Sequence, residues 1–190
     1  LGRRDPGPVR GLYVWGSVGR GKTWLMDSFH DSLPFEAKLR AHFHRFMREI
    51  HDALKGLRRH RDPLARVAAD LARRTRVICL DEFFVGDITD AMLLGTLLDH
   101  LFARGVCLVA TSNTHPDELY RGGLQRERFL PAIDLIHRHT RVIELAGDTD
   151  FRLRAFRQAE MYHWPLDEEA DRSLARTFER LTAEPWRADG

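Results

Sequence analysis

The chain has 190 residues, of which 43% are hydrophobic, enough for one α/β domain with a sizeable core and a small appendage. Its 30 lysines and arginines nearly balance 28 acidic residues, so the net charge of +2 neither requires nor excludes a nucleic-acid partner. The sequence contains no run of about 18 apolar residues, which argues against a helix that spans a bilayer.

The predicted secondary structure alternates between strands and helices. In chain order, we predict a strand over 11–15, a helix over 22–33, a strand over 37–43, helices over 44–59 and from Pro63, a strand over 77–80, a helix over 89–105, a strand over 106–111, helices over about 116–120 and 124–138, and a strand over 141–145. The run VICL (77–80) is apolar throughout, and VCLVAT (106–111) is apolar up to its last residue, as expected of strands in a buried parallel sheet. The alternation predicts an α/β fold, a doubly wound parallel sheet of five strands with helices on both faces.

The two cysteines, Cys79 and Cys107, each lie inside one of these apolar runs. We expect small, reduced core residues rather than a disulfide or a metal pair, which suits a cytoplasmic protein.

A glycine-rich turn joins the first predicted strand to the first helix. In GSVGRGKT (16–23), the spacing of Gly16, Gly21, Lys22 and Thr23 matches the phosphate-binding pattern G-x-x-x-x-G-K-[ST]. Glycines let backbone N–H groups turn inward around an anion, and the following helix adds the positive end of its dipole. Lys22 would reach the β- and γ-phosphates, and the Thr23 hydroxyl would hold Mg²⁺.

An ordinary turn that caps a helix is the alternative interpretation, but the strand, loop and helix in succession favour a nucleotide site. The residues predicted to form it are Gly16, Ser17, Val18, Gly19, Arg20, Gly21, Lys22, Thr23 and Trp24.

An acidic pair follows the third predicted strand. Asp81 and Glu82 come directly after VICL, at the carboxyl end of a buried strand, where parallel sheets bind ligands. Such pairs also cap helices or lie in solvated loops, and this pair alone does not decide between the two. Joined to the glycine-rich turn, it predicts that Asp81 completes a magnesium site with Thr23 and that Glu82 deprotonates the attacking water.

Polar residues also end the next strand, in Thr111-Ser112-Asn113-Thr114. Asn113 is predicted to contact the γ-phosphate and the attacking water, although these residue types also form turns. Farther along, Arg126 and Arg128 lie on the predicted helix over 124–138. Either arginine could act on a neighbouring active site, but without further information a solvated helix face is the simpler interpretation.

With these residues assembled, the chain resembles the ZapE family of AAA+ ATPases, a bacterial cell-division family with mitochondrial relatives. The resemblance rests on GLYVWGSVGRGKTWLMD (11–27), HFHRFM (42–47), LDEFFVGDITDAMLL (80–94), VATSN (109–113) and GLQRERFLPAI (123–133). It implies a P-loop NTPase domain of the AAA+ type over residues 1–149. Residues 150–190, with a helix over about 167–182, would then begin a helical lid that is truncated here.

The resemblance further implies Mg²⁺-dependent ATP hydrolysis by a ring-forming homo-oligomer. Lys22 and Thr23 would belong to Walker A, Asp81 and Glu82 to Walker B, and Asn113 would be sensor 1. Arg126 would be the arginine finger, acting on the neighbouring subunit. Family members are linked to the FtsZ ring and to the cytoplasmic face of the inner membrane. We therefore expect a cytoplasmic ATPase that remodels protein partners, with FtsZ as a candidate partner and peripheral membrane association.

Three other interpretations stay open. His42 and His44 share one face of the predicted strand, and paired imidazoles bind zinc, but the sequence offers no obvious third ligand nearby. The basic segments KGLRRHR (55–61) and RRTR (73–76) suit a nucleic-acid-linked ATPase of the helicase-loader type. A solvated basic face is favoured there, because no aromatic residues interleave for base stacking. The third is a scaffold that binds ATP and barely hydrolyses it, against which the acidic pair argues.

Overall fold

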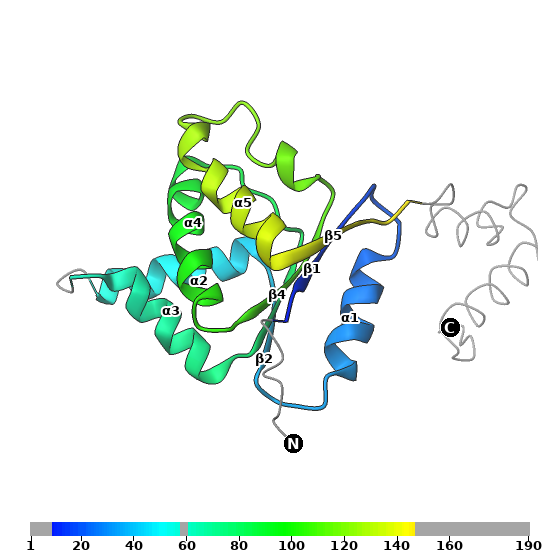
Figure 1. The fold of residues 1–190 in the computed structure, drawn as a ribbon, viewed down its shortest axis with the longest axis horizontal. Helices are drawn as coiled ribbons and strands as arrows, with labels where there is room; N and C mark the ends of the chain where they lie inside the picture. The colour runs from blue at the N-terminus through cyan, green and yellow to red at the C-terminus, as the bar shows by residue number, and fades with distance from the viewer. Residues whose placement is uncertain (1–8, 58–60, 147–190) are drawn as a thin grey trace, which may run out of the picture. The chain divides into compact units, whose positions relative to one another are not determined.

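One parallel sheet organises the domain. The computed structural model describes residues 9–57 and 61–146 (Figure 1). Its five strands lie in the order β2-β3-β4-β1-β5, and every neighbouring pair is parallel. The strands are β1 (Gly11–Trp15), β2 (Lys38–His42), β3 (Val77–Asp81), β4 (Cys107–Ser112) and β5 (Thr140–Glu144). The predicted five-stranded parallel sheet is confirmed.

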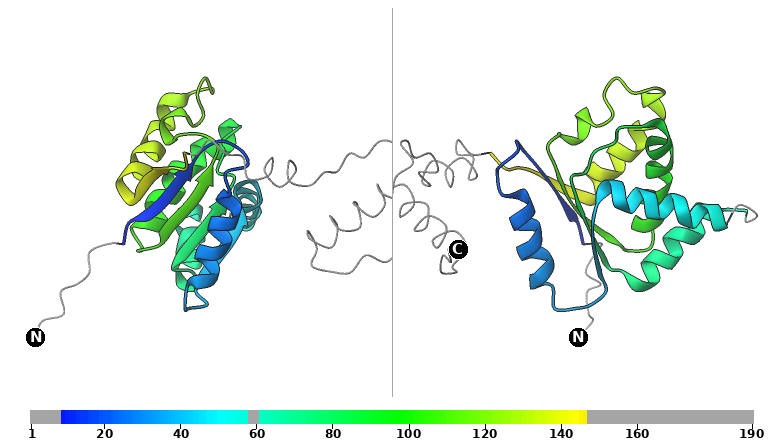
Figure 2. Two further views of the ribbon diagram at one scale, coloured as in Figure 1. Left: turned by 90° about the vertical axis from the view of Figure 1, so that its right-hand side faces the viewer. Right: turned by 180° about the vertical axis from the view of Figure 1, so that it is seen from behind.

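Helices cover both faces of this sheet, as predicted. They are α1 (Lys22–Ser32), α2 (Phe43–Gly56), α3 (Pro63–Arg74), α4 (Ile88–Phe102) and α5 (Leu130–His139), with 3₁₀ turns η1 (Pro116–Glu118) and η2 (Arg126–Arg128). The two views in Figure 2 show α1 on one face and the other four helices on the opposite face. The period of two along β3 explains this arrangement. Val77 and Cys79 pack with Met26 of α1, whereas Ile78 and Leu80 belong to the larger core under α2–α5.

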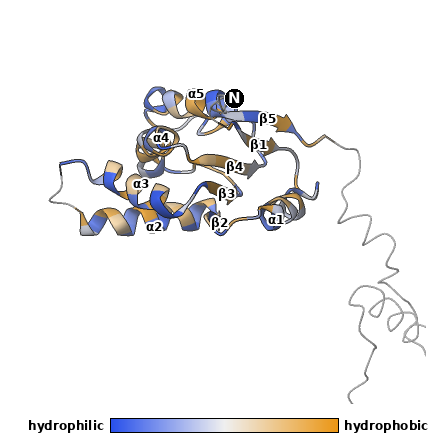
Figure 3. Ribbon diagram, turned by 60° about the horizontal axis from the view of Figure 1, so that its bottom comes forward, coloured by the Kyte–Doolittle hydropathy of each residue, from blue (hydrophilic) through white to orange (hydrophobic). Residues whose placement is uncertain are grey.

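The helices on the larger core differ in how much of their surface is apolar. Figure 3 shows hydrophobic and hydrophilic residues alternating along α2 and α3, as expected for helices with one buried face. In α4, by contrast, Leu94, Leu97, Leu98 and Leu101 are all buried, since the helix packs against both α3 and α5. The core therefore lies mainly on this side of the sheet.

Both cysteines are free, as expected. Cys79 on β3 is fully buried, and Cys107 on the adjacent β4 is partly exposed. Burial raises the pKa of the Cys79 thiol to about 12, so the reactive thiolate form is scarce at neutral pH.

The prediction of one helix over 124–138 is wrong. The segment forms the 3₁₀ turn η2 followed by α5, which begins only at Leu130. Gln125 adopts a left-handed backbone with φ of 57°, which no helix tolerates in its interior, and Pro131 sits in the first turn of α5. The predicted helix at 116–120 is likewise shorter and is the 3₁₀ turn η1.

The predicted lid over 150–190, with its helix near 167–182, lies outside the described residues. Within the described ranges, none of the helices combines the length and the apolar character that crossing a membrane requires.

Candidate nucleotide-binding site

The glycine-rich loop leaves the carboxyl end of β1 and turns directly into α1. Gly16, Gly19 and Gly21 all have positive φ, at 154°, 83° and 80°. A Cβ atom on Gly16 would lie 2.7 Å from the carbonyl oxygen of Leu145, so this position accepts only glycine without a shift of the backbone. The Gly16 N–H donates to the Ser112 carbonyl at the end of β4, over 3.2 Å. The loop is thereby fixed to two neighbouring strands.

Lys22 begins α1 and folds back over the loop. Its amino group donates to the carbonyl oxygens of Gly16 and Ser17, at 2.6 and 2.7 Å. Gly21 is the N-cap residue, so α1 has no side-chain cap, and no acidic residue lies in its first turn. The N–H groups of that turn are therefore available to an anion, and the helix dipole favours one there. The space beside Gly21 is open, since no heavy atom of the described residues lies within 4 Å of the point that a Cβ atom would occupy.

Two exposed side chains follow on the first turn of α1. Thr23, the predicted magnesium ligand, is exposed, and the Trp24 side chain is 72% exposed. The predicted binding residues from Gly16 to Trp24 thus form one continuous loop and helix start, with its hydroxyl and indole accessible to a ligand.

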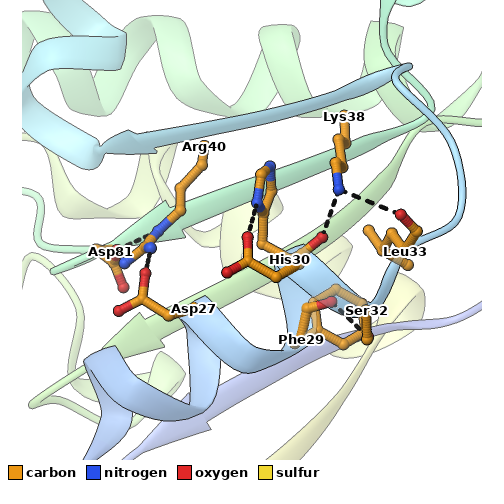
Figure 4. A network of polar contacts seen from close by, with 9 residues as sticks. Asp27, Phe29, His30, Ser32, Leu33, Lys38, Arg40 and Asp81 are labelled. Atoms are coloured by element: carbon orange, nitrogen blue, oxygen red, sulfur yellow. Dashed lines mark hydrogen bonds and ion pairs between the residues drawn. The ribbon is translucent and has the colours of Figure 1, made fainter.

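Asp81 ends β3 as a buried carboxylate, with a side chain only 3% exposed. Its Oδ1 accepts the Thr111 hydroxyl from β4 at 3.0 Å. Its Oδ2 accepts from Arg40 of β2, at 2.7 Å from Nη2 and 3.1 Å from Nε. Arg40 also forms an ion pair with Asp27 of α1 (Figure 4). Since Asp27 lies one turn after Thr23, this contact ties the carboxylate to the helix that carries the predicted magnesium hydroxyl.

The polar end of β4 joins the loop to the acidic pair. Thr111 accepts the Phe83 N–H at its carbonyl (2.7 Å) and the Glu82 N–H at its hydroxyl (3.4 Å). The Ser112 hydroxyl donates to the Phe83 carbonyl at 2.7 Å, while the Ser112 carbonyl accepts from Gly16. The glycine-rich loop and the Asp81–Glu82 segment therefore meet at the same edge of the sheet, with β4 between them.

Glu82 differs sharply from its neighbour. Its side chain is 73% exposed, and its φ of 54° is unusual for a residue other than glycine. This turn directs the carboxylate away from the buried Asp81 and into solvent. Nδ1 of His42, which pairs with Asp81 in the β2–β3 register, lies 3.8 Å from Glu82 Oε2. The His42 ring in turn stacks on His44, with ring centroids 5.9 Å apart.

Asn113 and Arg126 lie farther along the chain. Asn113 is exposed and follows β4 directly, between the ends of β1 and β3. Arg126, in η2, donates from Nη2 to the Asp117 carbonyl at 2.5 Å, while its buried Nε has no hydrogen-bond partner among the described residues. The Asp117 side chain accepts a hydrogen bond from His137, which holds the pKa of that carboxyl below its usual value. Arg126 thus contacts its own chain away from the acidic pair.

Two residues in this arrangement were not predicted from the sequence. Thr111 was recognised only as part of a polar strand end, and Arg40 carried no signal because the pattern does not show that β2 lies beside β3. Both contact Asp81 from adjacent strands.

The comparison with known families decides the assignment. The family model for the AFG1-like ATPase matches residues 1–189, almost the whole chain. The chain belongs to the AFG1-like ATPase family. It is 59% identical over 162 residues to the protein named cell division protein ZapE of Escherichia coli strain K12, which covers 85% of this chain and 43% of that protein. It is 40% identical to lactation elevated protein 1 homolog B of Danio rerio, over 93% of this chain and 37% of that protein.

This member of the AFG1-like ATPase family spans only about two-fifths of the length of these relatives. The crystal structure of DnaI superposes with a TM-score of 0.59 over 76% of this chain and 74% of that one, at 22% identity. This likeness confirms the P-loop NTPase fold.

In this AFG1-like ATPase, replacing Thr111 with valine is expected to lower the free energy of unfolding by about 1–3 kcal/mol. The change removes the hydroxyl that donates to Asp81 and leaves a buried carboxylate oxygen without that partner. Urea denaturation measures the effect. Replacing exposed Thr96 of α4 with valine is the matched control, expected to stay within about 0.5 kcal/mol of the original. Equal stability of the two variants would contradict the structural role of Thr111.

Proposed function

We propose that this chain binds ATP with Mg²⁺ and hydrolyses it. The observation that carries the proposal is the pair of contacts from β4. Ser112 accepts from Gly16 of the loop, and Thr111 bonds to Asp81 and to the Glu82 N–H. A phosphate-binding loop and an acidic pair thus share one edge of a parallel sheet, where ligands bind in such folds.

Each residue has a distinct part in this proposal. The N–H groups of the loop and of the first turn of α1 bind phosphate oxygens, and Lys22 adds a positive charge. The Thr23 hydroxyl and the Asp81 carboxylate supply the hard oxygen ligands that Mg²⁺ prefers. Bound magnesium would neutralise charge on the phosphates. Glu82, exposed beside the buried Asp81, accepts a proton from the attacking water, and Asn113 orients that water.

Nucleotide binding is testable through the exposed indole of Trp24, next to Thr23. Adding ATP and Mg²⁺ to the full-length protein should change tryptophan fluorescence in a saturable way. Lys22→Ala is expected to weaken binding by about tenfold, because the variant loses one charge–phosphate contact. Trp24→Phe tests the source of the signal: most of the fluorescence change should be lost, while calorimetry should still show saturable binding of ATP. Absence of binding by both methods would overturn the proposal.

The resemblance to ZapE extends the proposal to the whole protein. We infer a cytoplasmic homo-oligomer, a ring, that uses ATP turnover to remodel protein partners in cell division, with FtsZ as the candidate partner at the inner face of the membrane. The support is the 59% identity to a protein named for cell division. The test is the ATPase rate measured against protein concentration, with and without FtsZ polymers. A rate per subunit that is independent of both would contradict assembly and the partner.

A helicase-loader role is the alternative, and the DnaI likeness supports only its fold. The exposed arginines Arg73, Arg74 and Arg76 precede β3, at the opposite end of that strand from Asp81. A nucleic acid bound there would lie far along the strand from the proposed nucleotide site. Stimulation of turnover by single-stranded DNA, with a steep dependence on salt, would favour the loader interpretation.

A further inference from the structure

Arg40 lies between two carboxylates that come from different layers of the fold (Figure 4). Its Nε and Nη2 both donate to Oδ2 of Asp81 on β3, at 3.1 and 2.7 Å. Its Nη1 is ion-paired with Oδ1 of Asp27 on α1. One guanidinium thus joins the sheet to the helix that starts at the glycine-rich loop.

The exposed fraction of the side chain increases from Asp81 through Arg40 to Asp27. Asp81 is 3% exposed, Arg40 is 26% exposed and Asp27 is 47% exposed. A carboxylate as buried as Asp81 needs a counter-charge, because an unpaired buried charge is strongly unfavourable. Arg40 is the cationic side chain that contacts Asp81 in the described part of the chain.

We propose that Arg40 is a positioning residue. It acts as the internal counter-ion of Asp81 and competes with magnesium for that carboxylate. Asp27 binds the same guanidinium and so competes with Asp81 for it. The inference rests on the proposed function of Asp81 as a magnesium ligand. Both Arg40 and Mg²⁺ neutralise the same buried carboxylate, so a stronger Arg40–Asp81 pair means weaker coupling between magnesium and nucleotide.

The chemistry of the side chain fits this role. A guanidinium offers donors in a planar fork, so it bonds to both carboxylates at once, whereas the compact ammonium of lysine cannot span them in the same way. Asp27 competes with Asp81 for that fork. Weakening the Asp27 contact should therefore leave Arg40 more firmly on Asp81, and removing Arg40 should free Asp81 altogether.

The decisive measurement is the coupling between magnesium and nucleotide. For each variant of the full-length protein, calorimetry gives the Kd for ADP in EDTA and in excess Mg²⁺, and the ratio of the two reports the coupling. Arg40→Gln is expected to raise this ratio about tenfold over the original protein. Asp27→Asn is expected to lower it about threefold, because the half-exposed Asp27 contact is weaker. These opposite signs are the signature of competition.

A purely structural role predicts something else. Both variants would then lower the thermal unfolding midpoint and leave the ratio unchanged or move it in the same direction, which would overturn the proposal. Arg45→Gln is the control, since Arg45 is exposed and pairs with Glu49 in the same helix. If Arg40→Gln does not fold, Arg40→Lys replaces it, and a ratio unchanged from the original protein would count against competition.

Failure of the proposed function is distinguishable from failure of this inference. If the original protein binds ADP equally well in EDTA and Mg²⁺, the magnesium site itself is wrong, and the role of Arg40 falls with it. If the original protein shows coupling but the two variants do not shift it in opposite directions, the magnesium site stands and only the competition by Arg40 is excluded.

Discussion

Replacing Glu82 with glutamine is expected to stop ATP turnover while leaving ATP binding intact. The side chain is 73% exposed, so the substitution does not disturb the packing of the core. Glutamine has nearly the same shape but cannot accept the proton of the attacking water. We expect kcat to fall by about 10²–10⁴, the usual contribution of a general base. Phosphate release measures turnover, and calorimetry measures the Kd for ATP.

The backbone at this position does not complicate the test. Glu82 has a φ of 54°, and Gln125 already adopts a φ of 57° in the same chain, so glutamine tolerates this conformation here. Glu49→Gln, a change of an exposed glutamate on α2, is the matched control and should leave kcat unchanged. Substantial hydrolysis by the Glu82 variant would show that another group activates the water.

The sheet was predictable because each strand carries a strong local signal. The VICL run of β3 is apolar at every position, since the two faces of the strand pack under helices on opposite sides. The segment before α5 was not predictable in the same way. The apolar residues of this segment are spaced as in a helix, but the left-handed backbone at Gln125 interrupts the helix. Glutamine is not a helix-breaking residue, so the sequence gives no sign of the interruption.

The candidate site likewise contains residues that the sequence predicted and residues that it did not. Gly16–Thr23 and Asp81–Glu82 are recognisable because each motif is contiguous in sequence. Arg40 and Thr111 are important only through their contacts with Asp81, which require that β2 and β4 flank β3. Strand order is set by tertiary packing and does not follow chain order, so no local pattern reveals these two residues.

Arg126→Ala is expected to lower kcat of the assembled protein by about 10³, the low end of the effect of an arginine finger. Within the described part of its own chain, Arg126 makes one hydrogen bond to the Asp117 carbonyl, and its Nε is buried without a partner. Losing this hydrogen bond, whose donor is charged, is expected to lower the free energy of unfolding by about 1.5–3 kcal/mol. A loss of activity far larger than the loss of stability would therefore indicate a role in catalysis rather than in folding.

Arg128→Ala is the matched control, because Arg128 lies in the same 3₁₀ turn, is exposed and bonds to the nearby Gln125 side chain. It should keep kcat within about twofold of the original. Mixing the Arg126 variant with Lys22→Ala then separates two mechanisms. Each variant alone is expected to turn over ATP slowly. If the protein forms the proposed ring, a mixed ring contains interfaces where an intact Arg126 faces an intact Lys22, so part of the turnover should return. If no mixing ratio restores turnover, Arg126 acts inside its own subunit, and the contact with Asp117 becomes the place to look for its function.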